Sequence, residues 1–357
     1  MPERDELLES ISGIIEDYQT GEIEPPSPEY VDRWISQFDD DVQLPLLREL
    51  SHVLDNTYFS KKYISIFFTH QINNEKFIGD ESPKSFWKKA NFLDIQRNGK
   101  SQTEILELFG DALKDECDID INTCGCSEGP FIYLDDALFS GGRIGNDLCP
   151  WVKDEAPEVA TVHILVIACH RLGEWQCSKR LIETAQGVNK KIVFRFWAAI
   201  RFENRKAYRN RSEVLWPIDL SNNDTIAEYV AAEERFPFVP RAPGGELEHA
   251  IFSSEEGRQL LEKELLLAGI RIRSFSQHPS TSLRPLGYSP FGLGFGSMII
   301  TFRNCPNNTP LALWWGNPNM GPGHPLGKWM PLFPRKVYEE KNVEIDVDEF
   351  FKELFGE

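Results

Sequence analysis

The sequence predicts an α/β fold with a doubly wound parallel sheet, preceded by a helical N-terminal layer and followed by an α+β C-terminal extension. Strand-like and helix-like segments alternate between residues 91 and 197, which is the pattern of a parallel sheet. The apolar run 131–134 is typical of a strand buried on both faces. Only helical periodicity precedes residue 90. We therefore expect three regions, at residues 1–90, 91–200 and 201–357.

The N-terminal region contains four predicted helices and no residue cluster that indicates chemistry. Residues 2–18 place leucines and isoleucines along one side of a helix. Ser27 stands before Pro28, which predicts a helix with a serine N-cap and a proline in its first turn. Further helices are predicted at residues 44–54 and 61–72.

The central region is predicted to hold five strands and three helices. We expect the strands at residues 91–95, 119–121, 131–134, 161–169 and 192–197. We expect the helices at residues 103–113, 145–152 and 175–186. The loops 96–102, 135–143 and 170–173 each follow a strand, so they are expected at one edge of the sheet, where open α/β sheets bind ligands.

The C-terminal region has a less regular pattern. Ser253 and Ser254 predict the N-cap of a helix that runs to Ala268 and stops at Gly269. A strand is expected at residues 270–275. Residues 296–303 and 311–315 are expected to pair as a hairpin across an Asn/Pro-rich loop.

Charge and cysteine usage restrict the class of protein. The formal net charge of −18 argues against general binding to nucleic acid or to anionic membranes. The longest apolar run, residues 164–169, is too short to span a bilayer, and the N-terminal sequence does not resemble a signal peptide. Seven cysteines, an odd number, predict free thiols in a reducing compartment, so we expect a cytoplasmic protein.

A basic island stands out in this acidic chain. Its cations are Arg195, Arg201, Arg205, Lys206, Arg209 and Arg211. A solvated helix face is the favoured interpretation of such a run. A contact with nucleic acid through these residues is an alternative that is not favoured.

The segment 131–143 carries the main chemical signal. Two adjacent acids, Asp135 and Asp136, follow the apolar strand, and a small turn at Ser140, Gly141 and Gly142 follows them. The turn can direct several backbone N–H groups at one point before a helix begins, which suits a phosphate. The adjacent carboxylates suit the hydroxyls of a sugar. The alternative is a strand followed by a solvated acidic turn.

This segment resembles the phosphoribosyl-pyrophosphate (PRPP) signature of type I phosphoribosyltransferases, which runs from Leu134 to Arg143 in this chain. The resemblance implies that Asp135 and Asp136 hold the ribose hydroxyls and contact Mg²⁺. It implies that a phosphate cradle wraps the 5′-phosphate. The implied cradle residues are Ser140, Gly141, Gly142 and Arg143. Phe139 departs from the purine-salvage members of the family, which carry an acid there that handles the base proton.

The same resemblance assigns roles to a further loop and to the end of the last core strand. The loop after the first core strand is expected to bind pyrophosphate through its amides and cations. Its residues are Arg97, Asn98, Gly99 and Lys100. Near the last core strand, Phe196 or Trp197 is expected to stack on the base, with plain core packing as the alternative. His170 follows the 161–169 strand and is a candidate acid or base because its ordinary pKa is near neutrality, with a capping or solvent-facing histidine as the favoured alternative.

The chain also lacks a part that active type I enzymes usually have. A long lid is typical between the second and third core strands, whereas only residues 122–130 separate them here. A closing lid excludes water from an oxocarbenium-like reaction. The short connection keeps open a catalytically inactive sensor of PRPP or nucleotides that regulates a partner protein.

Over nearly its whole length the chain resembles a narrower group, the phosphoribosyltransferase-like PRTase-CE proteins of bacterial conflict loci. The resembling segments are residues 31–38, 99–102, 133–143, 252–256 and 306–315. This resemblance implies a ligand such as PRPP or a nucleotide, a Mg²⁺ cofactor, transfer or cleavage at ribose C1′, and an anti-phage role alongside a defence-system partner protein. No membrane partner is expected.

Overall fold

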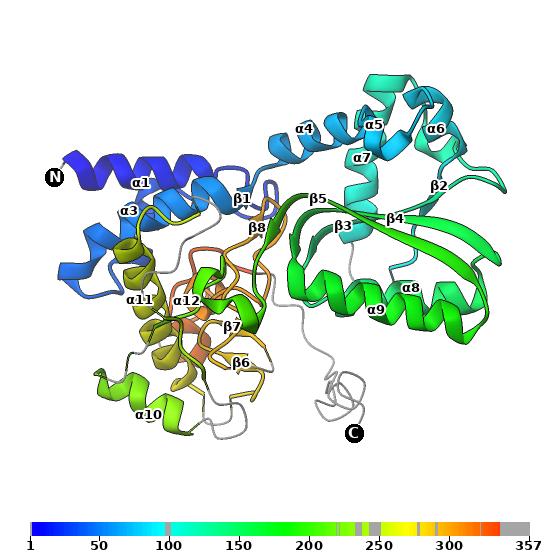
Figure 1. Cartoon of the computed structure of the whole chain (residues 1–357). Coiled ribbons are helices and arrows are strands. Elements are labelled where there is room, and N and C mark those ends of the chain that lie inside the picture. The colour runs from blue at the N-terminus through cyan, green and yellow to red at the C-terminus, as the bar shows by residue number, and fades with distance from the viewer. Residues whose placement is uncertain are drawn as a thin grey trace.

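The computed structural model describes residues 2–96, 101–218, 220, 222–232, 238–242, 251–276, 279–289, 292–321 and 323–335. Among these residues, no helix combines the length and the apolar character needed to cross a membrane. The chain forms two lobes that lie side by side in Figure 1. We call residues 61–202 the core lobe. The second lobe consists of residues 2–60 together with the described part of 203–335.

The elements of the core lobe come first. Its helices are α4 (Lys61–Ile72), α5 (Glu75–Ile78), α6 (Pro83–Lys89), α7 (Ser101–Cys117), α8 (Gly142–Asp154) and α9 (Arg171–Gly187). Its strands are β2 (Asn91–Leu93), β3 (Phe131–Leu138), β4 (Val159–His170) and β5 (Lys191–Phe202), and a 3₁₀ helix lies at Ile121–Thr123.

The second lobe is mainly helical. Its helices are α1 (Pro2–Ile14), α2 (Pro28–Ile35), α3 (Asp40–Thr57), α10 (Asp224–Ala232), α11 (Glu255–Arg273) and α12 (Leu311–Trp314). Its strands are short: β1 (Tyr58–Phe59), β6 (Leu283–Arg284), β7 (Gly287–Tyr288) and β8 (Ile300–Thr301). Two 3₁₀ helices lie at Lys206–Arg211 and Pro325–Gly327.

The predicted parallel α/β fold is confirmed. Strands β2, β3, β4 and β5 form one sheet in that order, and each neighbouring pair is parallel. Helix α7 shares a hydrophobic cluster with Ile132 and Leu134 on one face of β3. Helices α8 and α9 share another cluster with Tyr133 on the opposite face (Figure 1). The helix that follows β2 therefore covers one face of the sheet, and the helix that follows β3 covers the other. Open α/β sheets bind ligands where consecutive connections change faces in this way.

Two predicted caps are confirmed, and they explain where their helices begin. Ser27 Oγ accepts a hydrogen bond from the amide of Tyr30 at 3.3 Å. Ser254 Oγ accepts one from the amide of Gly257 at 2.9 Å. Each serine thereby satisfies an amide that lacks an intrahelical partner in the first turn.

Residues 119–121 do not form the predicted strand. Ile119 is buried, but the chain passes directly into the 3₁₀ helix Ile121–Thr123, which Asp120 caps through the amide of Asn122. Two isoleucines that flank an aspartate form a strand only when a neighbouring strand supplies hydrogen bonds. The described sheet has no strand next to β2 on its outer side.

Two of the C-terminal predictions, the strand and the hairpin, are wrong. Helix α11 continues through Gly269, so residues 270–273 are helical and the strand predicted at 270–275 is absent. A Cβ atom on Gly269 would lie 2.5 Å from the Pro285 carbonyl oxygen, so this glycine permits a close approach and does not end the helix. The predicted hairpin is also wrong. Ile300 and Thr301 pair in parallel with Tyr58 and Phe59, and residues 311–314 are helical.

The N-terminal helices divide between the lobes. Helix α3 contacts α1 and also α11, which belongs to the C-terminal region of the chain. Helix α4 contacts α7, and α5 and α6 lie with it over one face of the sheet (Figure 1). One hydrophobic cluster runs through both lobes. The boundary expected at residue 90 remains a prediction about independently folding units.

Candidate functional site

A cavity of about 230 Å³ lies at the carboxyl end of β3. One wall consists of residues between Asp136 and Ile144, which include the predicted phosphate turn. The other wall consists of residues from Ile299 to Asn308 together with Arg335. The site therefore lies between the lobes and takes residues from both.

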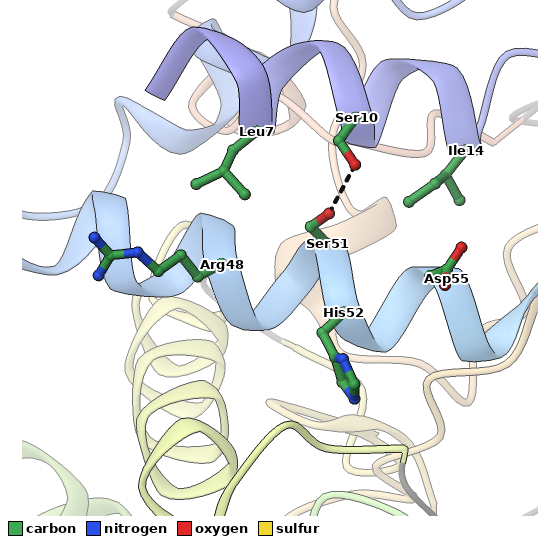
Figure 2. A pocket seen from close by; sticks show the side chains of 7 residues that line it. All are labelled: Leu7, Ser10, Ile14, Arg48, Ser51, His52 and Asp55. Atoms are coloured by element: carbon green, nitrogen blue, oxygen red, sulfur yellow. Dashed lines mark hydrogen bonds between the residues drawn. The ribbon is translucent and has the colours of Figure 1, made fainter. Parts of the chain in front are cut away.

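A larger hollow of about 470 Å³ lies between α1 and α3, as Figure 2 shows. Leu7 and Ile14 point into it from α1, and Ser10 Oγ and Ser51 Oγ are 3.0 Å apart across it. This hollow has no glycine turn and no adjacent acids, and it is open to solvent. We place the candidate site at the smaller cavity because polar groups from several segments converge there.

The two signature acids have different environments. Asp136 lines the cavity, and its Oδ1 accepts a hydrogen bond from the amide of Ala137 at 2.7 Å. Asp135 is only 1% exposed and does not line the cavity. Its Oδ1 accepts the amide of Asp136 at 2.9 Å. The two carboxyl groups nevertheless lie within hydrogen-bonding reach of each other, and this contact contributes to the raised pKa of Asp135.

Burial dominates the chemistry of Asp135. Loss of solvation raises the pKa of its carboxyl group to about 8, and the negative charge of Asp136 adds to the rise. The cation of Arg143 opposes the rise without cancelling it. The protonated form of Asp135 is therefore favoured at neutral pH, so the adjacent acids do not act as a matched pair of carboxylates.

The turn after β3 has a backbone geometry that requires glycine. Gly141 has φ = 79° and is the N-cap of α8. A Cβ atom on Gly141 would lie 2.7 Å from both the Gly173 carbonyl oxygen and Cys177 Cβ of α9. Ser140 Oγ accepts the amide of Gly142 at 3.3 Å. The turn is thus wedged against α9, and the positive end of the α8 dipole faces the cavity.

The predicted pyrophosphate residues Arg97, Asn98, Gly99 and Lys100 lie outside the described residues. Both ends of their loop are held by Gln102, whose side chain is fully buried. Gln102 Oε1 accepts the amides of Ile95 and Gln96, each at 2.8 Å. Gln102 Nε2 donates to the Leu134 carbonyl oxygen at 3.4 Å. The loop therefore begins and ends beside β3, at the residue that precedes the signature acids.

His170 has a structural environment. It is fully buried, and its Nδ1 lies 3.1 Å from the Leu138 carbonyl oxygen, which fits donation from Nδ1. Its ring stacks on Phe139 with centroids 5.1 Å apart. Burial lowers the pKa of its imidazole to about 4. His170 therefore stays neutral near pH 7 and fastens the end of β4 to the signature turn.

The predicted base-stacking residues lie away from the cavity. Trp197 Nε1 donates to His163 Nδ1 at 3.0 Å, and its ring lies 4.6 Å from that of Phe77 under α5. Phe196 packs against the hydrophobic cluster of α8 and α9. Neither residue lines the candidate cavity, and both have the packing expected of the plain-core alternative.

Sequence reasoning missed a cation that contacts the signature. Arg303 follows β8, and its Nη1 lies 3.7 Å from Asp136 Oδ2. Its Nε also donates to Glu104 Oε2 on α7. Burial alone would lower the pKa of Arg303, but the Glu104 hydrogen bond and the charge of Asp136 outweigh it and raise that pKa. No local pattern could identify Arg303, because it stands far from Asp136 along the chain.

The second wall is rich in carboxamides. Asn304, Asn307 and Asn308 line the cavity, and Asn308 Nδ2 donates to the Tyr288 carbonyl oxygen at 3.0 Å. Arg335 lies over the ring of Trp314 at 4.8 Å from its centroid. Among the described residues, no acidic side chain forms an ion pair with Arg335. The sequence gives only the Asn-rich run at 304–308 as a signal.

The sequence model of the PRTase-CE family matches residues 31–335. The chain belongs to this family. The match spans both lobes, so both walls of the cavity lie within the family region. It supports a phosphoribosyltransferase-like function and a ribose-phosphate ligand. No curated protein and no solved structure matches the chain.

Proposed function

We propose that this PRTase-CE protein binds PRPP or a related ribose-phosphate nucleotide in the cavity at the carboxyl end of β3 and transfers or cleaves at ribose C1′. One observation carries the proposal. A carboxylate, a glycine turn and a helix N-terminus meet in that cavity, beside the point where the chain switches faces of the sheet. This combination fits a sugar hydroxyl and a phosphate.

Asp136 accepts a hydrogen bond from a ribose hydroxyl, because it is the acid of the described residues that lines the cavity. The amides that open α8 bind the 5′-phosphate, with Arg143 as a counter-charge. Asp135 stays buried beneath and holds the amide of Asp136. In this proposal the two signature acids have different tasks: one binds the ligand and the other orders the strand end.

Cleavage at C1′ moves the bonding electron pair to the leaving group, either diphosphate or base, while a nucleophile forms the new bond to C1′. The proton of that nucleophile passes to solvent, because Phe139 occupies the position of the acid in purine-salvage enzymes and stacks on His170. The site therefore favours a good leaving group over general base catalysis.

Magnesium fits this site only together with a ligand. Among the described residues, no group of three or more His, Cys, Asp or Glu side chains is placed to hold a metal ion. Mg²⁺ is commonly bound by one or two carboxylates plus substrate phosphates, and Asp136 would be the carboxylate of this chain. When bound, Mg²⁺ would neutralise charge on a diphosphate leaving group.

Calorimetry with PRPP, with and without Mg²⁺, tests the binding proposal. Asp136→Asn should weaken binding about tenfold to a hundredfold, because the loss of a charge-assisted hydrogen bond costs roughly 1.5–3 kcal/mol. Asp32→Asn is a matched control, since Asp32 pairs with Arg4 on the second lobe and does not line the cavity. Equal affinity in the wild type and Asp136→Asn would remove Asp136 from the site.

A catalytically inactive sensor is the second candidate. The observation that favours it is the ion pair between Arg303 and Asp136, since a ligand that engages Asp136 changes a contact between the lobes. Release of diphosphate or free base from a bound ligand would establish the enzyme. Tight binding of PRPP without consumption of any candidate substrate would establish the sensor.

We further propose that the protein acts in bacterial anti-phage defence with a partner protein, which is the role implied by resemblance to conflict-locus proteins. Phage plating on cells that express wild type, Asp136→Asn or the Asp32→Asn control tests this role. Protection by the wild type and the control, with loss in Asp136→Asn, would link defence to the cavity. Equal protection by the wild type and both variants would mean that defence does not depend on the cavity.

A further inference from the structure

We propose that the 5′-phosphate of the ligand is clamped from both lobes, with Arg335 of the second lobe opposing the turn of the core lobe. This inference rests on the proposed function and names a residue to which neither the family match nor the signature assigns a role. It makes the cavity a joint site that neither lobe completes alone.

The charge of the cavity supports the clamp. Arg335 and Arg143 both line it, from opposite walls, in a chain whose formal net charge is −18. Arg335 has no acidic partner among the described residues, and the Trp314 ring supports its guanidinium at 4.8 Å. A guanidinium that is braced on an aromatic face and directed at a cavity is well suited to a phosphate.

The wall that carries Arg335 is fixed in place. The carbonyl of Pro334, the preceding residue, accepts the hydroxyl of Tyr18 at 3.1 Å. The amide of Phe333 donates to the Leu313 carbonyl oxygen at 2.8 Å, beside the tryptophan that supports Arg335. The backbone leading to Arg335 is thus tied to the N-terminal segment and to α12. Such anchoring lowers the entropy that the side chain loses on binding.

Backbone hydrogen bonds at Phe302, next to β8, connect the same wall to the N-terminal segment. The amide of Phe302 donates to the Phe59 carbonyl oxygen at 2.9 Å, and the Phe302 carbonyl accepts the amide of Gln19 at 2.6 Å. Arg303, the next residue, reaches Asp136 in the core lobe. In the proposed complex, the second lobe therefore contributes an arginine at each end of a ribose 5-phosphate. Arg303 lies on the hydroxyl side, next to Asp136, and Arg335 lies on the phosphate side.

The test compares Arg335→Gln with Arg271→Gln, using ribose 5-phosphate and PRPP as calorimetric probes. Arg271 is a matched control because it also lies over a tryptophan of the second lobe, Trp329 at 5.9 Å, and does not line the cavity. Arg335→Gln should lower the affinity for both ligands about tenfold to a hundredfold, and Arg271→Gln should leave both affinities unchanged.

A second variant at the same position distinguishes loss of the positive charge from loss of packing or misfolding. Arg335→Lys keeps the charge and should lose less affinity than Arg335→Gln, whereas the two should lose equally if only packing on Trp314 matters. A double-mutant cycle with Arg143→Gln adds a direct readout. If both arginines bind one phosphate, the losses should be non-additive.

The outcomes separate the two proposals. Wild-type affinity in Arg335→Gln, together with weakened binding in Asp136→Asn, would overturn the clamp and leave the proposed function standing. Equal loss in Arg335→Gln and Arg335→Lys would also overturn it. Absence of any ribose-phosphate binding in the wild-type protein would overturn the proposed function, and the clamp with it.

Discussion

The two walls of the cavity are built in different ways. The core wall consists of one continuous segment, and its predicted phosphate contacts are backbone amides at the start of α8. The second wall presents side chains: Arg335 and the asparagines of residues 304–308 line the cavity, and Arg303 pairs with Asp136. Backbone amides bind any phosphate monoester, whereas side chains can discriminate among ligands. We therefore expect both walls to supply affinity for the phosphate, and the side chains of the second lobe to supply selectivity as well.

The largest expected effect concerns the backbone of the core wall. Gly141→Ala should destabilise the protein by about 2–4 kcal/mol, because φ = 79° is strained for alanine and its Cβ would press on the Gly173 carbonyl. Gly142→Ala is the control, since the atom nearest to its added Cβ is 3.4 Å away. Urea unfolding of both variants measures the difference. Equal stability would mean that the turn is not wedged against α9. Gly141 is therefore a poor position at which to test binding alone.

The next effect concerns the loop that Gln102 holds. Gln102→Ala removes the acceptor of two backbone amides from a fully buried position, which should cost about 2–3 kcal/mol of stability. The variant should also lower the affinity for PRPP more than the affinity for ribose 5-phosphate. Only PRPP carries a pyrophosphate, and the loop predicted to bind it loses its hydrogen bonds to Gln102. Unfolding curves and calorimetry with both ligands check this. Equal weakening of the two ligands would contradict the pyrophosphate assignment.

A smaller and pH-dependent effect separates the signature acids. The pKa of Asp135 is about 8 in the folded protein against an ordinary value of 3.8, so folding takes up a proton between about pH 4 and pH 8. The free energy of unfolding should therefore fall as pH rises through this window, by at most about 1.4 kcal/mol per pH unit. Asp135→Asn removes this dependence.

Thermal unfolding at several pH values tests the sign of this effect. The Asn variant should gain most over the wild type near pH 8 and least near pH 4. Asp136→Asn, at the cavity, serves as the comparison, since Asp135 is the deeply buried member of the pair. An Asp135→Asn variant that is less stable than the wild type at pH 8 would show that the buried carboxyl group is charged and stabilising.

The core lobe was predictable from local patterns. The helix expected at 61–72 is α4, and the central strands and helices other than residues 119–121 are present. Two loop bounds were wrong: β3 continues to Leu138, so that Asp135 and Asp136 lie inside the strand, and α9 begins at Arg171, within the loop expected at 170–173. The strand β3, its acids and its turn follow from one stretch of sequence, because a buried strand and the turn after it are both local patterns. The prediction failed at residues 119–121, where the Ile-Asp-Ile segment has no neighbouring strand in the described sheet and Asp120 caps a 3₁₀ helix instead.

The second lobe was predicted less well, because its elements depend on distant partners. Strand β8 exists because β1, which belongs to the N-terminal region, supplies its hydrogen bonds. Gly269 lies inside α11 because Pro285 packs against it. Neither contact has a local signature, so propensity alone could not identify them.

The sequence by itself determined the parallel sheet and the segment from Leu134 to Arg143, because periodicity and turn chemistry act over a few residues. The family followed from the resemblance of the sequence to PRTase-CE proteins, which the match over residues 31–335 bears out. Only the tertiary structure decided that Asp135 is buried while Asp136 lines the cavity, because the packing differs between the two sides of one strand. It also decided that Arg303 and Arg335 face the signature. Such contacts depend on how the two lobes pack together, and no spacing along the chain encodes that packing.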